Sequence, residues 1–380
     1  MEKTAILMPN WVGDFILALS VVQNKFVPGD DVTLIVPEKL ALLSKMINPF
    51  ATIIYCRVDE LEYQATVQEI RREKFNRIYL LPRSFSAALL SFRSGIPHRR
   101  GIQSELRSFL LTDRLPRSTE NRSVHLTREY ARVLNTSYVP PEFHRGGALK
   151  NVARNNRQHT IVLCPGAAFG ATKRWPHFGE LITKQPQHHF TLLGDKNDVQ
   201  WVRDRFPSTT PNSNNLVGKT TLAEAAAIIA SSTLVVANDS GLLHLAGYLG
   251  KPAIGIYGST SPEWTRPLGT KTIVLSSGCT CAPCFKKACP RSTVECLSSI
   301  ATDRVVRKIK ELLGIIEITR LQDIYSTMVY RMISRATDNR ELVPVRVYRE
   351  YRSTGSIGSV PCGNNQPNAC IGVSGRYHTV

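Results

Sequence analysis

Apolar runs and helical repeats alternate along the first part of the chain. The segment "TAILM" (4–8) predicts a buried strand, and apolar residues then recur at helical spacing from Phe15 to Phe26. The segment "VTLIVP" predicts a second strand, so these elements form a βαβ unit. Further on, "RIYLLP" predicts another strand and "VHLTREYARVLN" a helix.

The alternation is clearer in the second half of the chain. Strands are predicted at "TIVLCPG", "HFTLLGD", "TLVVAND" and "PAIGIYG", and helices at "HFGELITK", "TLAEAAAIIASS" and "GLLHLAGYL". Strands that alternate with helices indicate a parallel sheet covered on both faces, so the fold class is α/β. Two such domains in tandem leave a cleft between the carboxyl ends of their strands, where ligands bind.

The length of 380 residues and the 42% apolar content favour two domains. The polar, basic segment Arg145 to Gln158 marks the boundary, so we expect domains at 1–150 and 151–317. Residues 318–380 are atypical: lysine is absent after Lys310, and the end is rich in Gly, Ser, Asn and Pro. This segment is a lineage-specific extension, a disordered basic tail or a translated frameshift, and we assign it no function.

The formal net charge of +18 predicts an anionic partner, for which nucleic acid, a phospholipid surface and a phosphorylated substrate all qualify. A cluster of basic residues between Arg71 and Arg128 is the expected contact surface, with a merely solvated face as the alternative. Its members are Arg71, Arg72, Lys74, Arg77, Arg83, Arg93, Arg99, Arg100, Arg107, Arg114, Arg117 and Arg122. No zinc-finger or RRM signature accompanies them, so we expect no nucleic-acid partner. Signal-peptide and membrane-span patterns are also missing, which predicts a cytoplasmic protein.

Three stretches carry candidate chemistry. In "VVANDSGLLHLAGYLGKP" a strand breaks at Asp239-Ser240-Gly241 and leads directly into a helix, whose free N–H groups suit a diphosphate. Asp239 and Ser240 are also favoured N-caps, so capping is an equal alternative. His244 lies in the first helical turn, near any bound anion, although packing is the more frequent role of such a histidine.

The stretch "CPGAAFGATKRWPHFGEL" places Lys173 and Arg174 just before a helix. A cation there stabilises a departing diphosphate, on which negative charge accumulates in the transition state. The alternative is a loop with two solvated cations and Trp175 as a packing anchor. Neither a P-loop nor a dinucleotide-binding glycine motif occurs at a strand-to-helix junction, which disfavours those enzyme classes.

The stretch "MPNWVGDFILALS" (8–20) offers Asp14 at the start of a helix, where aspartate is a good N-cap. The helix dipole depresses the pKa of such a carboxylate and weakens it as a base, whereas burial counters this effect. The spacing alone leaves capping and proton abstraction both open.

Together, "NWVGD", "PGA…KRWP" and "NDSGLLHLAGYLGKPAIGIYGSTSPEWTRPLG" closely resemble the bacterial lipopolysaccharide heptosyltransferases, the ADP-heptose glycosyltransferases of family 9. The heptosyltransferase II branch is the nearest. The resemblance runs from about residue 4 to residue 315 and includes all three motifs in order.

The resemblance implies a GT-B fold, with two Rossmann-like, doubly wound parallel-sheet domains that face each other across a cleft. It implies that the first domain holds the acceptor and the second holds ADP-heptose. The implied reaction is an inverting transfer of L-glycero-D-manno-heptose to the inner core of lipopolysaccharide, heptosyl-Kdo2-lipid A, without metal or cofactor. The anionic lipid A–Kdo acceptor then accounts for the basic first domain, and we expect peripheral attachment to the cytoplasmic face of the inner membrane.

The resemblance also implies roles for particular residues. Asp14 matches the proposed general base, and Lys173 matches a lysine that contacts phosphate. Asp239, Ser240 and Gly241 match the loop that holds the donor diphosphate and heptose, with His244 as its helical partner.

Two further residues, Asp195 and Thr220, are candidates for contacts with the nucleotide. Asp195 lies in the strand end "LLGDKND" and Thr220 in the loop "VGKTTL", although a solvated loop is the simpler interpretation of each.

The segment "CTCAPCFKKACPRSTVEC" holds five cysteines, and its C-x-x-C spacing is compatible with zinc. No second pair of matching spacing follows, so we expect a structural role and no metal.

Three alternatives stay open. One is another family 9 heptosyltransferase, which adds the first or a later core heptose. The second is a nucleotide-sugar 2-epimerase of GT-B fold, and the third is a catalytically silent lipopolysaccharide-binding protein on the same fold.

Overall fold

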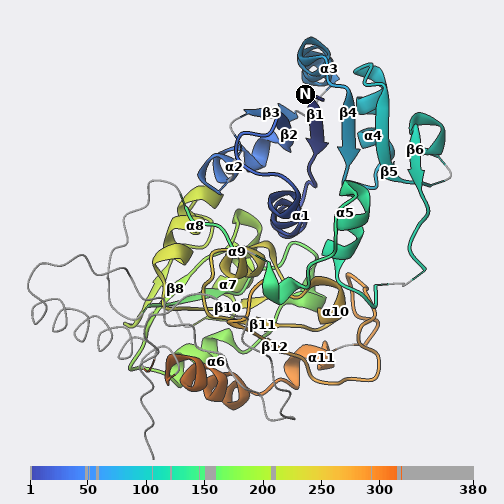
Figure 1. Ribbon diagram of the computed structural model, residues 1–380. Helices are drawn as coiled ribbons and strands as arrows, with labels where there is room; N and C mark the ends of the chain where they lie inside the picture. Colours follow the sequence, from blue (N-terminus) through green and yellow to red (C-terminus); the bar gives the residue numbers. More distant parts are fainter. Residues whose placement is uncertain are drawn as a thin grey trace, which may run out of the picture. The chain divides into compact units, whose positions relative to one another are not determined.

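The computed structural model contains two parallel six-stranded sheets (Figure 1). It describes residues 2–314 and 318, except for 48–49, 51, 57–59, 105, 120–121, 145, 150–159, 207–210 and 292. Of the predicted boundary segment 145–158 only residues 146–149 are described, and the predicted extension 318–380 lies outside the described residues except for residue 318.

The first sheet has the strand order β3-β2-β1-β4-β5-β6, and every neighbouring pair is parallel. Its strands are β1 (Thr4–Leu7), β2 (Val32–Pro37), β3 (Thr52–Cys56), β4 (Arg77–Leu80), β5 (His98–Ile102) and β6 (Asp113–Leu115). The helices of this half are α1 (Val12–Lys25), α2 (Ala41–Ile47), α3 (Glu60–Glu73), α4 (Phe85–Arg93) and α5 (Leu126–Leu134), with the 3₁₀ turns η1 (Glu38–Leu40), η2 (Ser108–Leu110) and η3 (Pro141–Phe143).

The second sheet repeats this topology, with the order β12-β11-β10-β7-β8-β9. Its strands are β7 (Thr160–Cys164), β8 (His189–Leu192), β9 (Ser213–Asn215), β10 (Leu234–Asn238), β11 (Ala253–Ile256) and β12 (Thr272–Leu275). The helices are α6 (Phe178–Thr183), α7 (Val199–Arg203), α8 (Leu222–Ser231), α9 (Gly241–Tyr248), α10 (Pro262–Thr265) and α11 (Glu295–Ser298), with η4 (Ala171–Lys173), η5 (Lys196–Asp198) and a helical segment over 302–314. Counted within each half, both sheets have the doubly wound order 3-2-1-4-5-6.

The predicted α/β class is confirmed, and alternate residues of the strands show why both faces of the first sheet are covered. Ile6 faces a core that includes α1 and α5, whereas Ala5 and Leu7 face a second core that includes α3 and α4. A strand that is apolar on both faces is typical of parallel sheets, because helices pack on each side.

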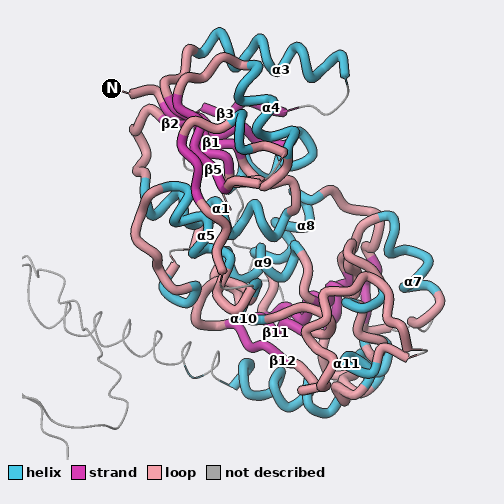
Figure 2. The backbone as a smooth tube through the Cα atoms, turned by 90° about the vertical axis from the view of Figure 1, so that its right-hand side faces the viewer, coloured by secondary structure: helices cyan, strands magenta, loops and turns pink. Residues whose placement is uncertain are grey.

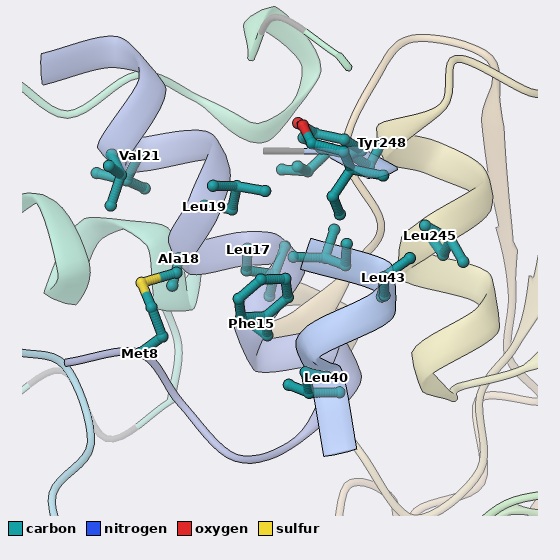
Figure 3. Close-up of a cluster of buried hydrophobic side chains, with 14 of the residues drawn as sticks. Met8, Phe15, Leu17, Ala18, Leu19, Val21, Leu40, Leu43, Leu245 and Tyr248 are labelled. Atoms are coloured by element: carbon teal, nitrogen blue, oxygen red, sulfur yellow. The ribbon is translucent and has the colours of Figure 1, made fainter. Parts of the chain in front are cut away.

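Helices α1 and α9 join the two halves. Phe15 and Leu17 of α1, Leu43 of α2, and Leu245 and Tyr248 of α9 belong to one cluster of buried side chains (Figure 3). The tube view shows α9 below α1, between the strands of the two sheets (Figure 2). The contact therefore fixes the N-terminal ends of both helices beside each other.

None of the helices in the described part of the chain is long and apolar enough to cross a membrane.

Candidate active site

A cavity of about 430 Å³ lies between the two halves, at the carboxyl ends of the strands. All eight residues that the sequence analysis singled out line it: Asp14, Lys173, Asp195, Thr220, Asp239, Ser240, Gly241 and His244. Residues more than two hundred positions apart in the sequence therefore meet in one site.

The topology explains this convergence. Asp14 follows β1, whereas Lys173 follows β7 and Asp239 follows β10. In each sheet the strand order reverses between the first and fourth strands, β1 and β4 or β7 and β10. Ligands of open α/β sheets bind at the carboxyl ends of the strands at such a switch point. The cavity thus brings the switch points of two sheets together.

Two glycines allow the helix ends to approach so closely. A Cβ atom on Gly13 would lie 2.6 Å from Cδ2 of His244, and one on Gly241 would lie 2.5 Å from Cβ of Val12. Real Cβ atoms do not make such contacts, so only glycine fits at either position. The glycines of the "NWVGD" and "NDSG" motifs are therefore packed against the opposite motif.

Asp239 is the centre of a buried polar cluster. Lys173 Nζ donates to its Oδ2 at 2.6 Å, and Thr260 Oγ1 donates to the same oxygen at 2.5 Å. His244 Nε2 lies 3.7 Å from Oδ1, an ion-pair distance rather than a hydrogen bond. Burial alone would raise the pKa of Asp239, but His244 and Lys173 outweigh it and lower the pKa to about 2. Asp239 is accordingly an anion that holds the Lys173 ammonium in the cavity.

Asp14 is the opposite case. Burial is the largest influence and raises the pKa of its carboxyl group, while the charges of His244 and Lys173 lower it in part. The dipole effect considered from the sequence is therefore not the dominant one. A carboxylate with a raised pKa accepts a proton more readily than an exposed aspartate does.

Neither motif supplies a side-chain cap to its helix. The N-cap of α1 is Trp11, so Asp14 is the third residue of the helix, and no side chain caps it. Ser240 is the N-cap of α9, but its hydroxyl makes no cap hydrogen bond. Among the described residues, the buried atoms Ser240 Oγ and His244 Nδ1 have no hydrogen-bond partner. Polar atoms left unpaired in a cavity are free to bind a ligand.

Part of the cavity lining is apolar. Leu193, Leu222 and Ala225 contribute to it, and Asp195 and Thr220 are their close neighbours in the sequence. Asp195 also has a structural role, because its side chain accepts from Asn197 N at 2.7 Å in a capping box of η5.

The loop after β7 carries the two predicted cations. Lys173 lines the cavity, whereas Arg174 Nη2 bonds Asp198 Oδ1 at 2.8 Å. Trp175 is fully buried, which confirms its role as a packing anchor.

The sequence analysis missed Thr260, which follows β11 and donates the second hydrogen bond to Oδ2 of Asp239. It also missed Tyr130, a buried residue of α5 whose pKa is raised by burial and then by Asp14, whereas Arg83 lowers it. Arg83 forms an ion pair with the buried Glu129 and lies 6.0 Å above the ring of Trp264. Isolated aromatic and threonine residues carry no motif, so only the fold could reveal them.

The prediction of one continuous basic surface is wrong in part. Arg107 is fully buried, and its Nη1 donates to the carbonyl of Pro82 at 2.8 Å. Arg100 bonds Asp113 Oδ2 at 2.5 Å and the carbonyl of Val133 at 2.9 Å. These guanidinium groups bond to atoms of the protein itself, although Nε and Nη2 of Arg107 have no hydrogen-bond partner among the described residues.

The cysteine segment packs beside the loop that carries Lys173. Thr172 Oγ1 donates to the carbonyl of Lys286 at 2.6 Å, and Phe285 N donates to Ser259 O at 2.7 Å. All five cysteines of the segment are free thiols. Within the described ranges no group of three or more His, Cys, Asp or Glu residues is placed to hold a metal ion.

Comparison with known proteins identifies the family. The family model for glycosyltransferase family 9 (heptosyltransferase) matches residues 63–295. The chain is 27% identical to lipopolysaccharide heptosyltransferase 2 of Escherichia coli, over 72% of this chain and 87% of that one. It is 28% identical to lipooligosaccharide heptosyltransferase 2 of Haemophilus ducreyi, over 82% of this chain and 99% of that one.

Solved structures agree. The structure of E. coli ADP-heptose lps heptosyltransferase II superimposes with a TM-score of 0.69 and 25% identity, over 83% of this chain and 99% of that one. The structure of E. coli heptosyltransferase WaaC with ADP gives a TM-score of 0.63 at 18% identity, over 81% and 99%, respectively. The predicted GT-B fold is thereby confirmed. Of the alternatives left open by the sequence, the matches favour a glycosyltransferase over a nucleotide-sugar epimerase or a catalytically silent binding protein. The chain belongs to glycosyltransferase family 9, the heptosyltransferases.

Proposed function

We propose that this enzyme transfers L-glycero-D-manno-heptose from ADP-heptose to the inner core of lipopolysaccharide, with heptosyl-Kdo2-lipid A as acceptor. Family membership and the heptosyltransferase 2 relatives support the reaction class. The observation that carries the mechanism is that a partly buried carboxylate of raised pKa, Asp14, lines the same cavity as Lys173 and the N-terminus of α9.

In the proposed reaction, the acceptor hydroxyl attacks the anomeric carbon of heptose from the face opposite ADP. The new glycosidic C–O bond forms as the bond to the ADP oxygen breaks, so the configuration inverts. Asp14 takes the hydroxyl proton, and the electron pair leaves with ADP. Lys173 and the free N–H groups at the start of α9, near Ser240 and Gly241, stabilise the diphosphate as its charge grows.

The donor is assigned to the second half of the chain and the acceptor to the first, with the division near residue 150. Asp239 orients Lys173, and Ser240 and His244 offer unpaired polar atoms to the diphosphate or the heptose. Asp195 and Thr220, which line the cavity and are close in sequence to its apolar residues, are assigned to the nucleoside.

Arg83 is assigned to the acidic part of the acceptor. It follows β4 at the carboxyl edge of the first sheet and lies within electrostatic range of Tyr130, as Asp14 does. Arg83 is exposed, and Arg117 and Arg122 lie within electrostatic range of it. A group of like charges of this kind favours binding of a carboxylate or phosphate. Such an acceptor is carried by a lipid, so the enzyme would work at the cytoplasmic face of the inner membrane.

The test is transfer of heptose from ADP-heptose to purified heptosyl-Kdo2-lipid A, followed by mass spectrometry of the product. Asp14→Asn should lower kcat about 10²- to 10⁴-fold, the usual contribution of a general base, and leave ADP-heptose affinity within about twofold. Absence of transfer by folded wild-type protein would refute the proposed acceptor. Full activity of Asp14→Asn would refute the role of the base.

An enzyme that adds the first or a later core heptose is the alternative within the family. Parallel assays with Kdo2-lipid A and with longer core acceptors distinguish these activities, because each enzyme extends a different truncated core.

A further inference from the structure

Four large apolar side chains gather on the solvent side of α4 and η2. Phe85 and Phe92 are 44% and 51% exposed, and Leu106 and Phe109 are 75% and 67% exposed. We call this set the α4–η2 patch. Single exposed apolar residues are ordinary, but a group on adjoining elements indicates a binding surface.

Contacts between α4 and η2 hold the aromatic members of the patch in place. Phe85 and Phe92 are seven residues apart and lie on one face of α4, while Ala88 and Leu90 of that helix are buried against the sheet. The rings of Phe85 and Phe109 have centroids 6.4 Å apart. Arg99 lies 5.5 Å above the ring of Phe92 and donates to the carbonyl of Leu110 at 2.7 Å, which ties α4 to η2.

Basic residues border the patch. Arg83 precedes α4 and Arg93 ends it, and both are exposed. Arg71 of α3 donates to the carbonyl of Arg93 at 2.6 Å, so the exposed cations at the end of α3, Arg72 and Lys74 among them, are anchored beside α4. Figure 1 shows α3 and α4 next to each other at the first sheet.

Aromatic side chains surrounded by arginine and lysine suit one partner best, the surface of an anionic lipid bilayer. Insertion of phenylalanine at the boundary between headgroups and acyl chains is favourable, and each cation near an anionic leaflet strengthens binding by about 1 kcal/mol. A protein partner of similar strength would need complementary apolar and acidic surfaces, whereas an anionic leaflet presents both in every orientation.

We propose that the α4–η2 patch docks the enzyme on an anionic membrane. This inference rests on the proposed function and specifies how the enzyme meets its lipid-linked acceptor. Arg83 borders the patch and lies 6.0 Å from the ring of Trp264, whose neighbour Thr265 lines the cavity, so an acceptor anchored in the leaflet would extend past Arg83 toward Asp14.

The experiment measures sedimentation of the full chain with vesicles of phosphatidylcholine alone or mixed with phosphatidylglycerol. Wild type should bind the mixed vesicles and lose binding as salt rises, because the cations are screened. The double variant Phe85→Ser/Phe109→Ser should bind about tenfold more weakly, from two lost partly inserted aromatic groups. Phe143→Ser, which removes an aromatic residue that is 69% exposed on η3, is the matched control and should bind as wild type does.

A second readout separates folding and catalysis from docking. With a lipid-free core oligosaccharide as acceptor, the double variant should keep wild-type turnover, whereas its transfer to acceptor embedded in vesicles should fall. Wild type that transfers heptose but does not bind mixed vesicles refutes the docking surface alone. Wild type that binds vesicles but transfers no heptose refutes the proposed function alone. A concentration-dependent dimer in sedimentation velocity that the double variant abolishes would assign the patch to a second copy of the chain instead.

Discussion

Gly13 and His244 are in direct contact across the two halves of the enzyme. The Cα atom of Gly13 lies so close to the imidazole that a Cβ atom built on it would be only 2.6 Å from Cδ2 of His244. His244 in turn lies 3.7 Å from Asp239, and Asp14 follows Gly13 directly. The position of the proposed base relative to the donor site therefore depends on the absence of one side chain.

Gly13→Ala should consequently impair both folding and catalysis. The methyl group must displace His244, and overpacking of this kind costs about 1–3 kcal/mol. We expect a lower melting temperature and a larger loss in kcat than in donor affinity, measured by thermal unfolding and steady-state kinetics. Gly314→Ala is the matched control because nothing lies within 4 Å of a Cβ atom at that position. A Gly13→Ala enzyme as active and stable as Gly314→Ala would contradict the close contact.

The pH profile should report Asp14. The carboxylate must be ionised to accept a proton, and burial raises its pKa above the ordinary value of 3.8. Activity should therefore fall as the pH is lowered through a value above 3.8, in an acidic limb of kcat/KM.

The charges near Asp14 predict the direction in which two variants should shift this pH profile. Lys173 lowers the pKa of Asp14, so Lys173→Met should move the limb to higher pH. Asp239 raises that pKa, so Asp239→Asn should move the limb to lower pH. The midpoint of the acidic limb is measured on the residual activity of each variant and does not depend on how large that activity is. Shifts in the reverse directions would mean that another group titrates.

Ser240→Ala should weaken donor binding without destabilising the fold. The buried hydroxyl has no partner among the described residues, so its removal breaks no internal hydrogen bond. If it binds the diphosphate or heptose, its loss should raise the dissociation constant of ADP-heptose about three- to tenfold. Ser44→Ala removes another buried, unpaired hydroxyl, on α2 and away from the cavity, and should leave that constant unchanged. Calorimetric titration and thermal unfolding check both variants, and equal affinities would exclude a donor contact for Ser240.

Arg83→Ala should raise the KM for the acceptor about tenfold and leave the KM for ADP-heptose near its wild-type value. Arg77→Ala is the control, because Arg77 starts β4 at the opposite edge of the sheet and pairs with Glu2. Both substitutions remove one positive charge, so a difference between them reports where the cation lies rather than the change in net charge. An equal effect of both substitutions would point to general electrostatic attraction rather than a binding site.

The sequence predicted those elements whose apolar pattern is regular. The expected strands at β1, β2, β4, β7, β8, β10 and β11 all occur, because strands buried on both faces are almost continuously apolar. Strand β5 was not predicted, since its residues "HRRGI" resemble a basic surface. Arg99 and Arg100 satisfy carbonyl groups and Asp113 there, which a charge count cannot distinguish from solvated cations.

The site could be predicted residue by residue only through motifs. Each motif residue lies at a strand end or a helix start, so the eight candidates were found before their contacts were known. Tyr130 contributes through its position in space and no local pattern marks it, whereas Thr260 lies inside the third motif without being distinguished there, and Arg83 was only one member of the basic cluster. The pKa of Asp14 depends on burial by the opposite half of the enzyme, which local sequence does not contain.

The contact between α1 and α9 also determines how the cavity can open. Its buried side chains come from both halves, so pulling the halves apart would expose Phe15, Leu245 and their neighbours to water. A rotation about this contact preserves the buried surface. Atoms near such a pivot move least, so Asp14 keeps its distance from Asp239 while the rims travel. Arg122, stacked on Phe285 at 4.3 Å, and the Glu142–Arg266 ion pair also join the two halves, so a rotation about α1 and α9 would shift or separate these pairs.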